Sequence, residues 1–275
     1  MLNMSDIVLV DDFPKGFGGS ELVNNTIAKH FKVSKFISSQ ELKTINEECT
    51  YIICNISLMS DFMVNLIATK ANYIILEHDY KFVRSRHPWR YENCIVPENE
   101  TVNKIIYKNA MAVFVQTDDH LDVFKRNNID GNFISLKCSV WDKEELEYLN
   151  HLRNKNKTKK SKFCVVQSDN WIKNQQGAEK WLSDIKLDYD LVKSNNNTRE
   201  FLETISEYAA LVFLPVARES CCRLIVEARC MGLNVVTTPN SGAFQSNWYT
   251  LPAGQLVKYL RDQSKRNLKA IGDYL

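Results

Sequence analysis

Two carboxylates eight residues apart are the first candidates for chemistry in this 275-residue chain. Glu219 precedes a predicted helix and Glu227 lies inside it, between short apolar strands predicted at 211–214 and 235–238. A helix N-terminus offers free backbone N–H groups and a partial positive charge, which suit a phosphate. A carboxylate before the helix can hold sugar hydroxyls, and one deeper in it can hold a ribose. Taken alone, the spacing is more typical of a helix-start acid followed by an exposed helical glutamate.

The backbone donors expected at this helix start belong to Cys221, Cys222 and Arg223. Ser220 is the predicted N-cap and Gly232 the predicted helix stop. Together these residues predict a strand–helix–strand unit, which many nucleotide-handling folds contain. A hydroxyl-rich ligand is the simplest reason for two carboxylates beside a phosphate site.

A glycine-rich loop follows the first predicted strand, residues 6–10. It contains Gly18, Gly19 and Glu21, where backbone N–H groups can approach a phosphate or another ligand. The dinucleotide fingerprint is excluded because Glu21 occupies its last glycine position, and a Walker loop is excluded because no Gly-Lys-Ser/Thr sequence occurs there. A flexible turn with a serine cap explains the loop equally well.

Titratable side chains follow another buried strand, predicted at 73–76. His78 and Asp79 stand at its carboxyl end, where the ligands of open α/β sheets bind. The next loop carries basic residues and no acid: Lys81, Arg84, Arg86, His87 and Arg90. Such a loop suits a phosphorylated or otherwise anionic acceptor. The alternatives are a histidine bonded to backbone and a solvated surface loop.

The two ends of the chain resemble retaining glycosyltransferases of the two-Rossmann (GT-B) type with an E-x7-E motif, which are family 4-like. The resemblance is carried by Glu219-x7-Glu227 with Ala228, Gly232, Val235, Val236 and Gly242, and by Gly18-Gly19-x-Glu21. The middle of the chain resembles this family poorly. A small phage, viral or bacterial member is the expectation.

The resemblance implies a role for each matching residue. Glu219 would hold the donor sugar and His78 would lie beside it, as the catalytic residues. The donor-binding residues would be Gly18, Gly19, Lys173, Glu227, Cys221, Cys222 and Arg223, and the acceptor-side residues Asp79, Lys81, Arg84 and Arg86. Glu227 would bind the ribose and Lys173 the diphosphate. The arginine that accompanies this lysine in the family is replaced by Ser168, which puts the usual donor binding in doubt; Arg218 or Arg223 would have to supply the missing charge.

The predicted fold is α/β, with two Rossmann-like domains (GT-B architecture) and a cleft between them. Residues 1–153 would form the acceptor-side domain, and residues 163–275 the nucleotide-sugar donor domain. The lysine-rich segment 154–162 is the predicted linker. The resemblance implies that the last helix crosses back to the first domain.

The composition predicts a cytoplasmic protein. A net charge of +2 excludes a strongly basic nucleic-acid binder by bulk charge, and 44% hydrophobic residues are ordinary for a globular chain. No apolar segment reaches the roughly 18 residues of a membrane span, and acidic residues flank the first apolar run, unlike a signal peptide. The eight cysteines form no C-x-x-C pair, so reduced thiols and no metal site are expected.

The chain is therefore predicted to be an enzyme, a hexosyl- or pentosyltransferase without a cofactor that consumes a UDP- or GDP-type sugar. Metal-independent transfer is expected because lysine, arginine and a helix terminus can neutralise the diphosphate. A saccharide, a small molecule, a lipid-linked acceptor or a DNA base, as in phage DNA modification, all fit as acceptors. A catalytically silent nucleotide-sugar binding module and a nucleotide-sugar epimerase are the alternative interpretations.

Overall fold

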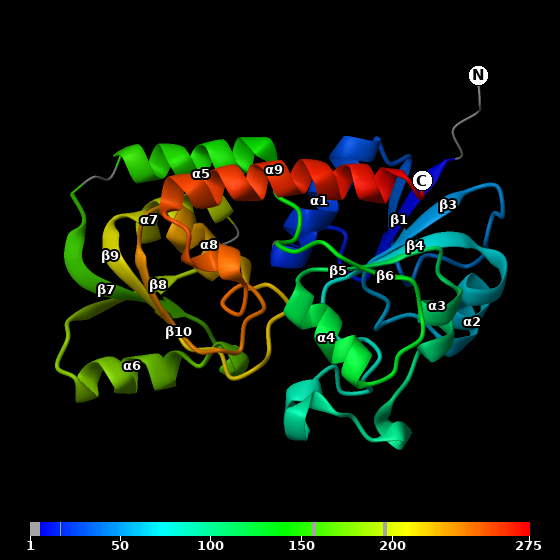
Figure 1. The fold of residues 1–275 in the computed structure, drawn as a ribbon, viewed down its shortest axis with the longest axis horizontal. Coiled ribbons are helices and arrows are strands. Elements are labelled where there is room, and N and C mark those ends of the chain that lie inside the picture. The colour runs from blue at the N-terminus through cyan, green and yellow to red at the C-terminus, as the bar shows by residue number, and fades with distance from the viewer. Residues whose placement is uncertain (1–5, 17, 156–157, 195–196) are drawn as a thin grey trace. The chain divides into compact units, whose positions relative to one another are not determined.

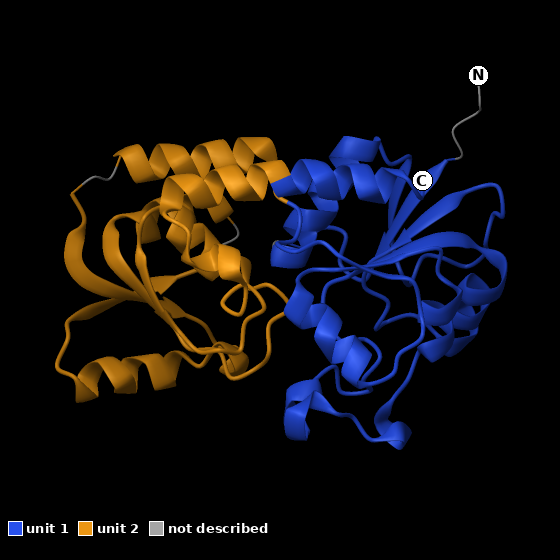
Figure 2. Cartoon of the chain, viewed as in Figure 1, with its two compact units in different colours: residues 1–140, 263–275 blue, residues 141–262 orange. Residues whose placement is uncertain are grey.

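The structure, a computed structural model, describes residues 6–16, 18–155, 158–194 and 197–275. The chain forms two compact units (Figure 2). Unit 1 comprises residues 1–140 and 263–275, and unit 2 comprises residues 141–262. Each unit is built around its own parallel β-sheet with helices packed on it (Figure 1).

In the described residues, unit 1 has a six-stranded parallel sheet with strand order β2-β1-β3-β4-β5-β6. The strands are β1 (Ile7–Asp11), β2 (Lys35–Ser38), β3 (Thr50–Ile53), β4 (Asn72–Glu77), β5 (Val113–Val115) and β6 (Phe133–Ser135). The central strands are mostly apolar because both faces of the sheet are covered. Val10 and Ile53 belong to the core on one face, and Leu9 and Ile52 to the core on the other.

The helices of unit 1 begin at recognisable signals. They are α1 (Gly19–Phe31), α2 (Asp61–Lys70), α3 (Lys104–Asn109) and α4 (Asp118–Arg126), with short 3₁₀ turns η1 (Pro88–Arg90), η2 (Glu92–Cys94) and η3 (Glu98–Glu100). Ser60 caps α2 and Thr117 caps α4, each with a side chain that accepts a hydrogen bond from the backbone three residues on.

Unit 2 has, among its described residues, a four-stranded parallel sheet with strand order β10-β9-β7-β8. Its strands are β7 (Lys160–Gln167), β8 (Tyr189–Lys193), β9 (Tyr208–Phe213) and β10 (Asn234–Thr237). Its helices are α5 (Lys143–Lys155), α6 (Gln175–Asp184), α7 (Thr198–Ser206) and α8 (Arg223–Cys230), with η4 (Trp171–Lys173) and η5 (Asn247–Thr250). Val165 and Val212 of the sheet pack with Ala178 and Leu182 of α6.

The two units divide between Val140 and Trp141, upstream of the linker predicted at 154–162. Helix α5 belongs to unit 2 because Leu146, Leu149 and Leu152 form a buried apolar face. The lysine-rich segment therefore lies inside unit 2, between α5 and β7, and its last lysines are part of β7. Residues 156 and 157 of that segment lie outside the described residues.

The last helix, α9 (Ala253–Gly272), contributes to both units. Its residues up to 262 group with unit 2, and Gln263–Leu275 groups with unit 1. In unit 1 the buried amide of Asn267 donates hydrogen bonds of 2.7 Å to the carbonyl oxygens of Leu136 and Ser139. Within the described ranges, no helix combines the length and apolar character needed to cross a bilayer.

We expect Asn267→Ala to lower the free energy of unfolding by about 1–3 kcal/mol, because it leaves two carbonyl oxygens of unit 1 without their donor. Urea denaturation measures the change. The matched control is Lys265→Ala on the exposed face of the same helix, for which a change within about 0.5 kcal/mol is expected. Equal effects of the two substitutions would contradict this anchoring role.

Candidate functional site

In unit 2, polar side chains meet at the carboxyl ends of the strands. Lys173 follows β7, Glu219 follows β9 and Ser241 follows β10. The backbone of Glu219 is fixed there, since its N–H donates to Asn240 at 2.9 Å and its carbonyl accepts from Gly242 at 3.0 Å. The loops after β9 and β10 are thereby joined at the edge of the sheet where parallel α/β folds bind ligands.

Lys173 and Glu219 form an ion pair at this edge. The Nζ atom of Lys173 donates to Oε1 of Glu219 at 2.7 Å, and the two side chains are 36% and 23% exposed. Burial disfavours the charge of Lys173, but the neighbouring Glu219 carboxylate raises its pKa overall, so the lysine is a cation. The structure thus brings together the residues predicted to hold the donor diphosphate and the donor sugar.

The start of α8 differs from the prediction. The N-cap is Cys222, with left-handed backbone angles (φ 65°, ψ 74°), rather than Ser220. The N-cap lies two residues later than predicted because the preceding loop is held elsewhere. The Cys221 carbonyl accepts hydrogen bonds from Ser241 Oγ at 2.9 Å and from the Ala243 N–H at 3.1 Å. The preceding loop is therefore held by the loop after β10, and the helix begins only at Arg223.

The thiols at this helix start are neutral. Cys221 and Cys222 are both buried. Burial raises the pKa of the Cys221 thiol to about 12 and raises that of Cys222 well above its usual range. Because the thiolate is the reactive form, these cysteines can contribute backbone groups to a ligand but not nucleophiles.

Glu227 and Arg223 belong to a buried ion cluster. The Arg223 guanidinium pairs with Glu145 of α5 and, at 3.5 Å, with Glu227, and it lies 3.8 Å from the ring centroid of Trp141. The Arg223 and Glu227 side chains are each 7% exposed. The charge of Arg223 is therefore committed to carboxylates within unit 2, and the alternative that Glu227 is an exposed helical residue is wrong.

The charge state of this cluster follows from its composition. One guanidinium faces two carboxylates in a buried place. Burial raises the pKa of Glu227 to about 7; the Arg223 charge opposes this rise and the Glu145 carboxylate adds to it. Near neutral pH the Glu227 carboxyl is therefore partly protonated, so it can donate as well as accept a hydrogen bond.

In unit 1, a hydrogen-bonded network orients His78 beyond the end of β4. Asn24 of α1 donates from Nδ2 to Asp11 at 2.9 Å, so its Oδ1 is the acceptor that lies 2.7 Å from Nε2 of His78. A hydrogen is thus assigned to Nε2 of His78, because this network provides an acceptor for it. Gln116 approaches the other ring nitrogen at 3.4 Å. His78 is held in one orientation by side chains from two further elements.

The glycine-rich loop is shaped by Glu21. A Cβ atom on Gly16 would lie 2.7 Å from the Glu21 side chain, and one on Gly18 would lie 2.5 Å from it. The Glu21 carboxylate also accepts a hydrogen bond from Ser20 at 2.9 Å. Gly18 is the N-cap of α1 and Gly19 its first residue. The glycines at 16 and 18 thus make room for a buried glutamate, while their closure over a ligand stays a prediction.

Three of the four lysine and arginine side chains of the basic loop lie beside carboxylates, and Arg90 lies 5.8 Å from the ring centroid of Trp89. Lys81, which is 4% exposed, pairs with Glu77 and, at 3.2 Å, with Asp79. Arg86 also pairs with Asp79, while the exposed Arg84 lies 3.9 Å from Glu100. The sequence of residues 81–90 contains no acid, but the fold supplies carboxylates from outside it. These pairs reduce the positive charge that the loop can offer, and its role in binding an anionic acceptor stays a prediction.

Several residues of these networks were missed by sequence analysis: Asn24, Gln116, His120 and Glu145. The first two of these residues could have been identified from the sequence. Asn24 is a polar residue on the buried face of α1, and Gln116 directly follows an apolar strand. His120 is fully buried and bonds to the Asp79 carbonyl at 2.6 Å, a contact without a local sequence signal.

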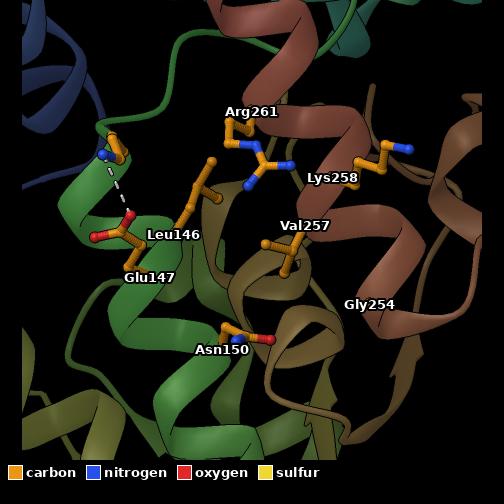
Figure 3. A pocket seen from close by; sticks show the side chains of 8 residues that line it. Leu146, Glu147, Asn150, Gly254, Val257, Lys258 and Arg261 are labelled. Carbon is orange, nitrogen blue, oxygen red and sulfur yellow. Dashed lines mark ion pairs between the residues drawn. The ribbon is translucent and has the colours of Figure 1, made fainter.

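A pocket of about 180 Å³ lies between α5 and α9 in unit 2, away from these residues (Figure 3). Leu146 and Asn150 line it from α5, and Val257 and Arg261 line it from α9. None of the predicted site residues lines this pocket. Within the described residues, no group of three or more His, Cys, Asp or Glu side chains is placed to hold a metal ion.

Comparison with solved structures identifies the fold. Anabaena HepE, in a crystal structure with UDP and glucose, matches with a TM-score of 0.58 and 12% identity over 95% of this chain and 89% of its own. Sucrose-phosphate synthase from Thermosynechococcus elongatus matches with a TM-score of 0.56 and 11% identity over 86% of this chain and 82% of its own. The predicted α/β fold class of GT-B type is confirmed. Neither a protein-family model nor a curated protein sequence matches the chain.

The buried cluster predicts a pH-dependent stability. The pKa of Glu227 is about 7 in the folded protein, above the roughly 4.3 of an unfolded glutamate, so the native state binds more protons between these values. Its contribution is fully present below about pH 4 and is lost as the pH rises through 7. Glu227→Gln should therefore reduce the difference in unfolding free energy between pH 5 and pH 8 by roughly 2 kcal/mol. Urea denaturation at both pH values measures it, and unchanged pH dependence in the variant would exclude this charge state.

Proposed function

We propose that this protein is a glycosyltransferase that binds a nucleotide-diphosphate sugar at the carboxyl edge of the unit 2 sheet. The observation that carries the proposal is the Lys173–Glu219 ion pair, which joins a cation and a hydrogen-bond acceptor next to the start of α8. A diphosphate needs the first and a sugar needs the second. The fold shared with HepE, whose crystal structure contains UDP and glucose, supports a UDP-type donor.

Lys173 would neutralise the leaving diphosphate. An ammonium group has three donors, so it can bond a phosphate oxygen while it keeps Glu219 in place. Ser168 stands where an arginine would be expected, and the Arg223 guanidinium is already paired with two carboxylates. Lys173 and the backbone N–H groups at Cys222 and Arg223 would therefore carry the charge that develops in the transition state, without a metal ion.

Glu219 would accept hydrogen bonds from the hydroxyls of a hexose or pentose that is transferred with retention of its anomeric configuration. Glu227 would contact the ribose through its partly protonated carboxyl. Gly18, Gly19 and Cys221 would contribute backbone groups to the donor, and unit 1 would supply His78.

On the acceptor side we propose Asp79, Lys81, Arg84 and Arg86. A saccharide, a small molecule and a DNA base, the last in phage DNA modification, are the candidate acceptors. The cytoplasm is the proposed location, because all eight cysteines, which lie in the described ranges, are buried free thiols.

A catalytically silent nucleotide-sugar binding module is the second candidate. Two observations favour it: Ser168 stands where an arginine would be expected, and Arg223 is already paired with Glu145 and Glu227. The donor diphosphate then has fewer cations than a transferase of this kind normally uses. Such a protein would bind the nucleotide sugar and show neither transfer nor hydrolysis.

Donor binding is tested by thermal shift with UDP, GDP, ADP, dTDP and their sugar conjugates. We expect UDP or GDP to stabilise the protein, by about 2.7 kcal/mol at one hundred times its dissociation constant. Lys173→Met should remove the shift because the diphosphate loses its cation. Lys180→Met is the matched control, since this lysine is exposed on α6 and pairs with Asp184 on the surface. If no nucleotide shifts the melting curve, the donor site is wrongly assigned.

Turnover is tested by consumption of UDP- and GDP-sugars by the variant Glu219→Gln. We expect it to lower the rate at least 100-fold with UDP affinity within a few-fold of wild type, because the lost charge acts on the reacting sugar and not on the nucleotide. Glu207→Gln, a surface glutamate paired with Lys160, is the control. Normal kinetics in Glu219→Gln would exclude the proposed role. Nucleotide binding without any turnover in wild type would favour the silent module.

A further inference from the structure

Unit 1 contains a pocket of about 260 Å³ that follows the carboxyl ends of β3 and β4. Its lining mixes apolar side chains such as Ile56, Val83 and Val102 with polar ones, among them Ser57, Arg86 and Asn103. This is the edge at which a parallel sheet binds its ligand, and a pocket with apolar walls and a few placed polar groups is the usual form of a small-molecule site.

The charges of this pocket are balanced before any ligand enters. The three cations that line it are Lys81, Arg84 and Arg86. Asp79 bonds both Lys81 and Arg86, Glu77 bonds Lys81, and Glu100 lies beside Arg84. Asp61 adds a further carboxylate to the lining. An anionic ligand at Lys81 would have to displace Glu77 or Asp79, which would leave a buried charge without its partner. Arg84 and Arg86 are more exposed, 66% and 40%, and face Glu100 and Asp79.

The polar groups of the pocket are held in place by the fold. Arg86 donates to Ser57 Oγ at 2.8 Å, and the Ser57 N–H donates to Asp12 at 2.8 Å. Asn103 donates to the Lys81 carbonyl at 2.9 Å. Arg86 and Asn103 both have left-handed backbone angles, φ 60° and 58°, a conformation that non-glycine residues keep only where the surrounding structure imposes it.

One hydrogen-bond acceptor next to the pocket is left over. Asn55 is 6% exposed, and its amide nitrogen donates to Asp11 at 2.9 Å. Its Oδ1 atom has no hydrogen-bond partner among the described residues. The following residue, Ile56, lines the pocket. A sugar hydroxyl can donate a hydrogen bond to an acceptor of this kind, whereas an ionised phosphate oxygen cannot.

We infer that this pocket binds an uncharged, hydroxyl-rich acceptor, a neutral saccharide, and that Asp79 is the specificity-determining residue that excludes phosphorylated acceptors. The inference rests on the proposed glycosyltransferase function and narrows its acceptor. Neutral hydroxyls can use Arg86, Ser57 and Asn103 without breaking an ion pair, and the C–H faces of a sugar can lie against the apolar lining. Asp79 does not line the pocket itself, but it pairs with Lys81 and Arg86, which do, so a phosphate group would have to compete with Asp79 for these cations.

The test is equilibrium binding by calorimetry, with UDP present and absent, of glucose, galactose and mannose and of the 6-phosphate of each. We expect at least one neutral sugar to bind, and its 6-phosphate to bind at least about tenfold more weakly. The inference is overturned if a 6-phosphate binds more tightly than its parent sugar, if no sugar binds, or if duplex DNA binds and Arg84→Met abolishes that binding.

Asp79→Asn tests the specificity role directly. The variant releases Lys81 and Arg86 from a shared carboxylate while it keeps the size of the side chain. We expect the preference to reverse, with the 6-phosphate bound at least about tenfold more tightly than by wild type and inorganic phosphate also bound. Glu98→Gln is the matched control, because Glu98 pairs with Lys104 on the surface and lines no part of the pocket. An unchanged preference in a variant that melts as wild type does would exclude Asp79 as the determinant.

The donor and acceptor ideas fail separately. UDP binding is followed in the same samples by thermal shift, and it depends on Lys173 of unit 2. Stabilisation by UDP without binding of any sugar overturns the acceptor pocket and leaves the donor site standing. Sugar binding without stabilisation by UDP overturns the donor site and leaves the acceptor pocket standing.

Discussion

The parallel direction of every described strand pair is the constraint on which the rest of this structure depends. In a parallel sheet all carboxyl ends lie at one edge, and the helices that return the chain cover the faces. The loops at that edge are therefore the places where polar residues from distant segments meet. Lys173 and Glu219 are 46 residues apart and form an ion pair for this reason. In unit 1, Asn24 on helix α1 meets His78, which follows β4 and is 54 residues away.

Burial of charge distinguishes the cations of the two units. Lys81 and Arg223 are buried, and each is paired with two carboxylates. Their charges therefore stabilise the fold. Lys173 is more exposed and shares its ion pair with Glu219, which is itself reachable by solvent. A partly exposed lysine can bind a ligand in place of its carboxylate partner at a small cost in free energy. Removal of one partner from a buried ion pair costs much more. This difference in solvation is why we propose Lys173, rather than the arginine at the helix start, as the cation of the donor site.

The shared fold and the local chemistry give different kinds of support. Identities of 12% and 11% to HepE and to sucrose-phosphate synthase establish a common architecture. A fold of this kind carries many functions, so the activity has to be argued from the site. The proposed donor site contains Lys173 and Glu219, while Ser168 stands where the resemblance predicts an arginine and Arg223 is already paired with Glu145 and Glu227. A measurement of turnover distinguishes a transferase from a silent module, because turnover depends on the positive charge available to the donor diphosphate.

The sequence by itself determined the fold class, because the apolar runs of buried strands are local patterns. Glu219 and His78 were singled out as polar residues after predicted strands, whereas Lys173 was named from the resemblance, and the roles of all three stay predictions. Only the tertiary structure decided which unit α5 belongs to, because its leucine face has no partner in the sequence. It also decided that the N-cap position of α8 falls at Cys222, that Glu227 is buried with Arg223, and that three cations of the basic loop lie beside carboxylates. The partners in these cases, Glu145, Glu77 and Glu100 among them, come from other segments. Charge balance and solvation are properties of neighbours in space, and a pattern of neighbours in sequence does not contain them.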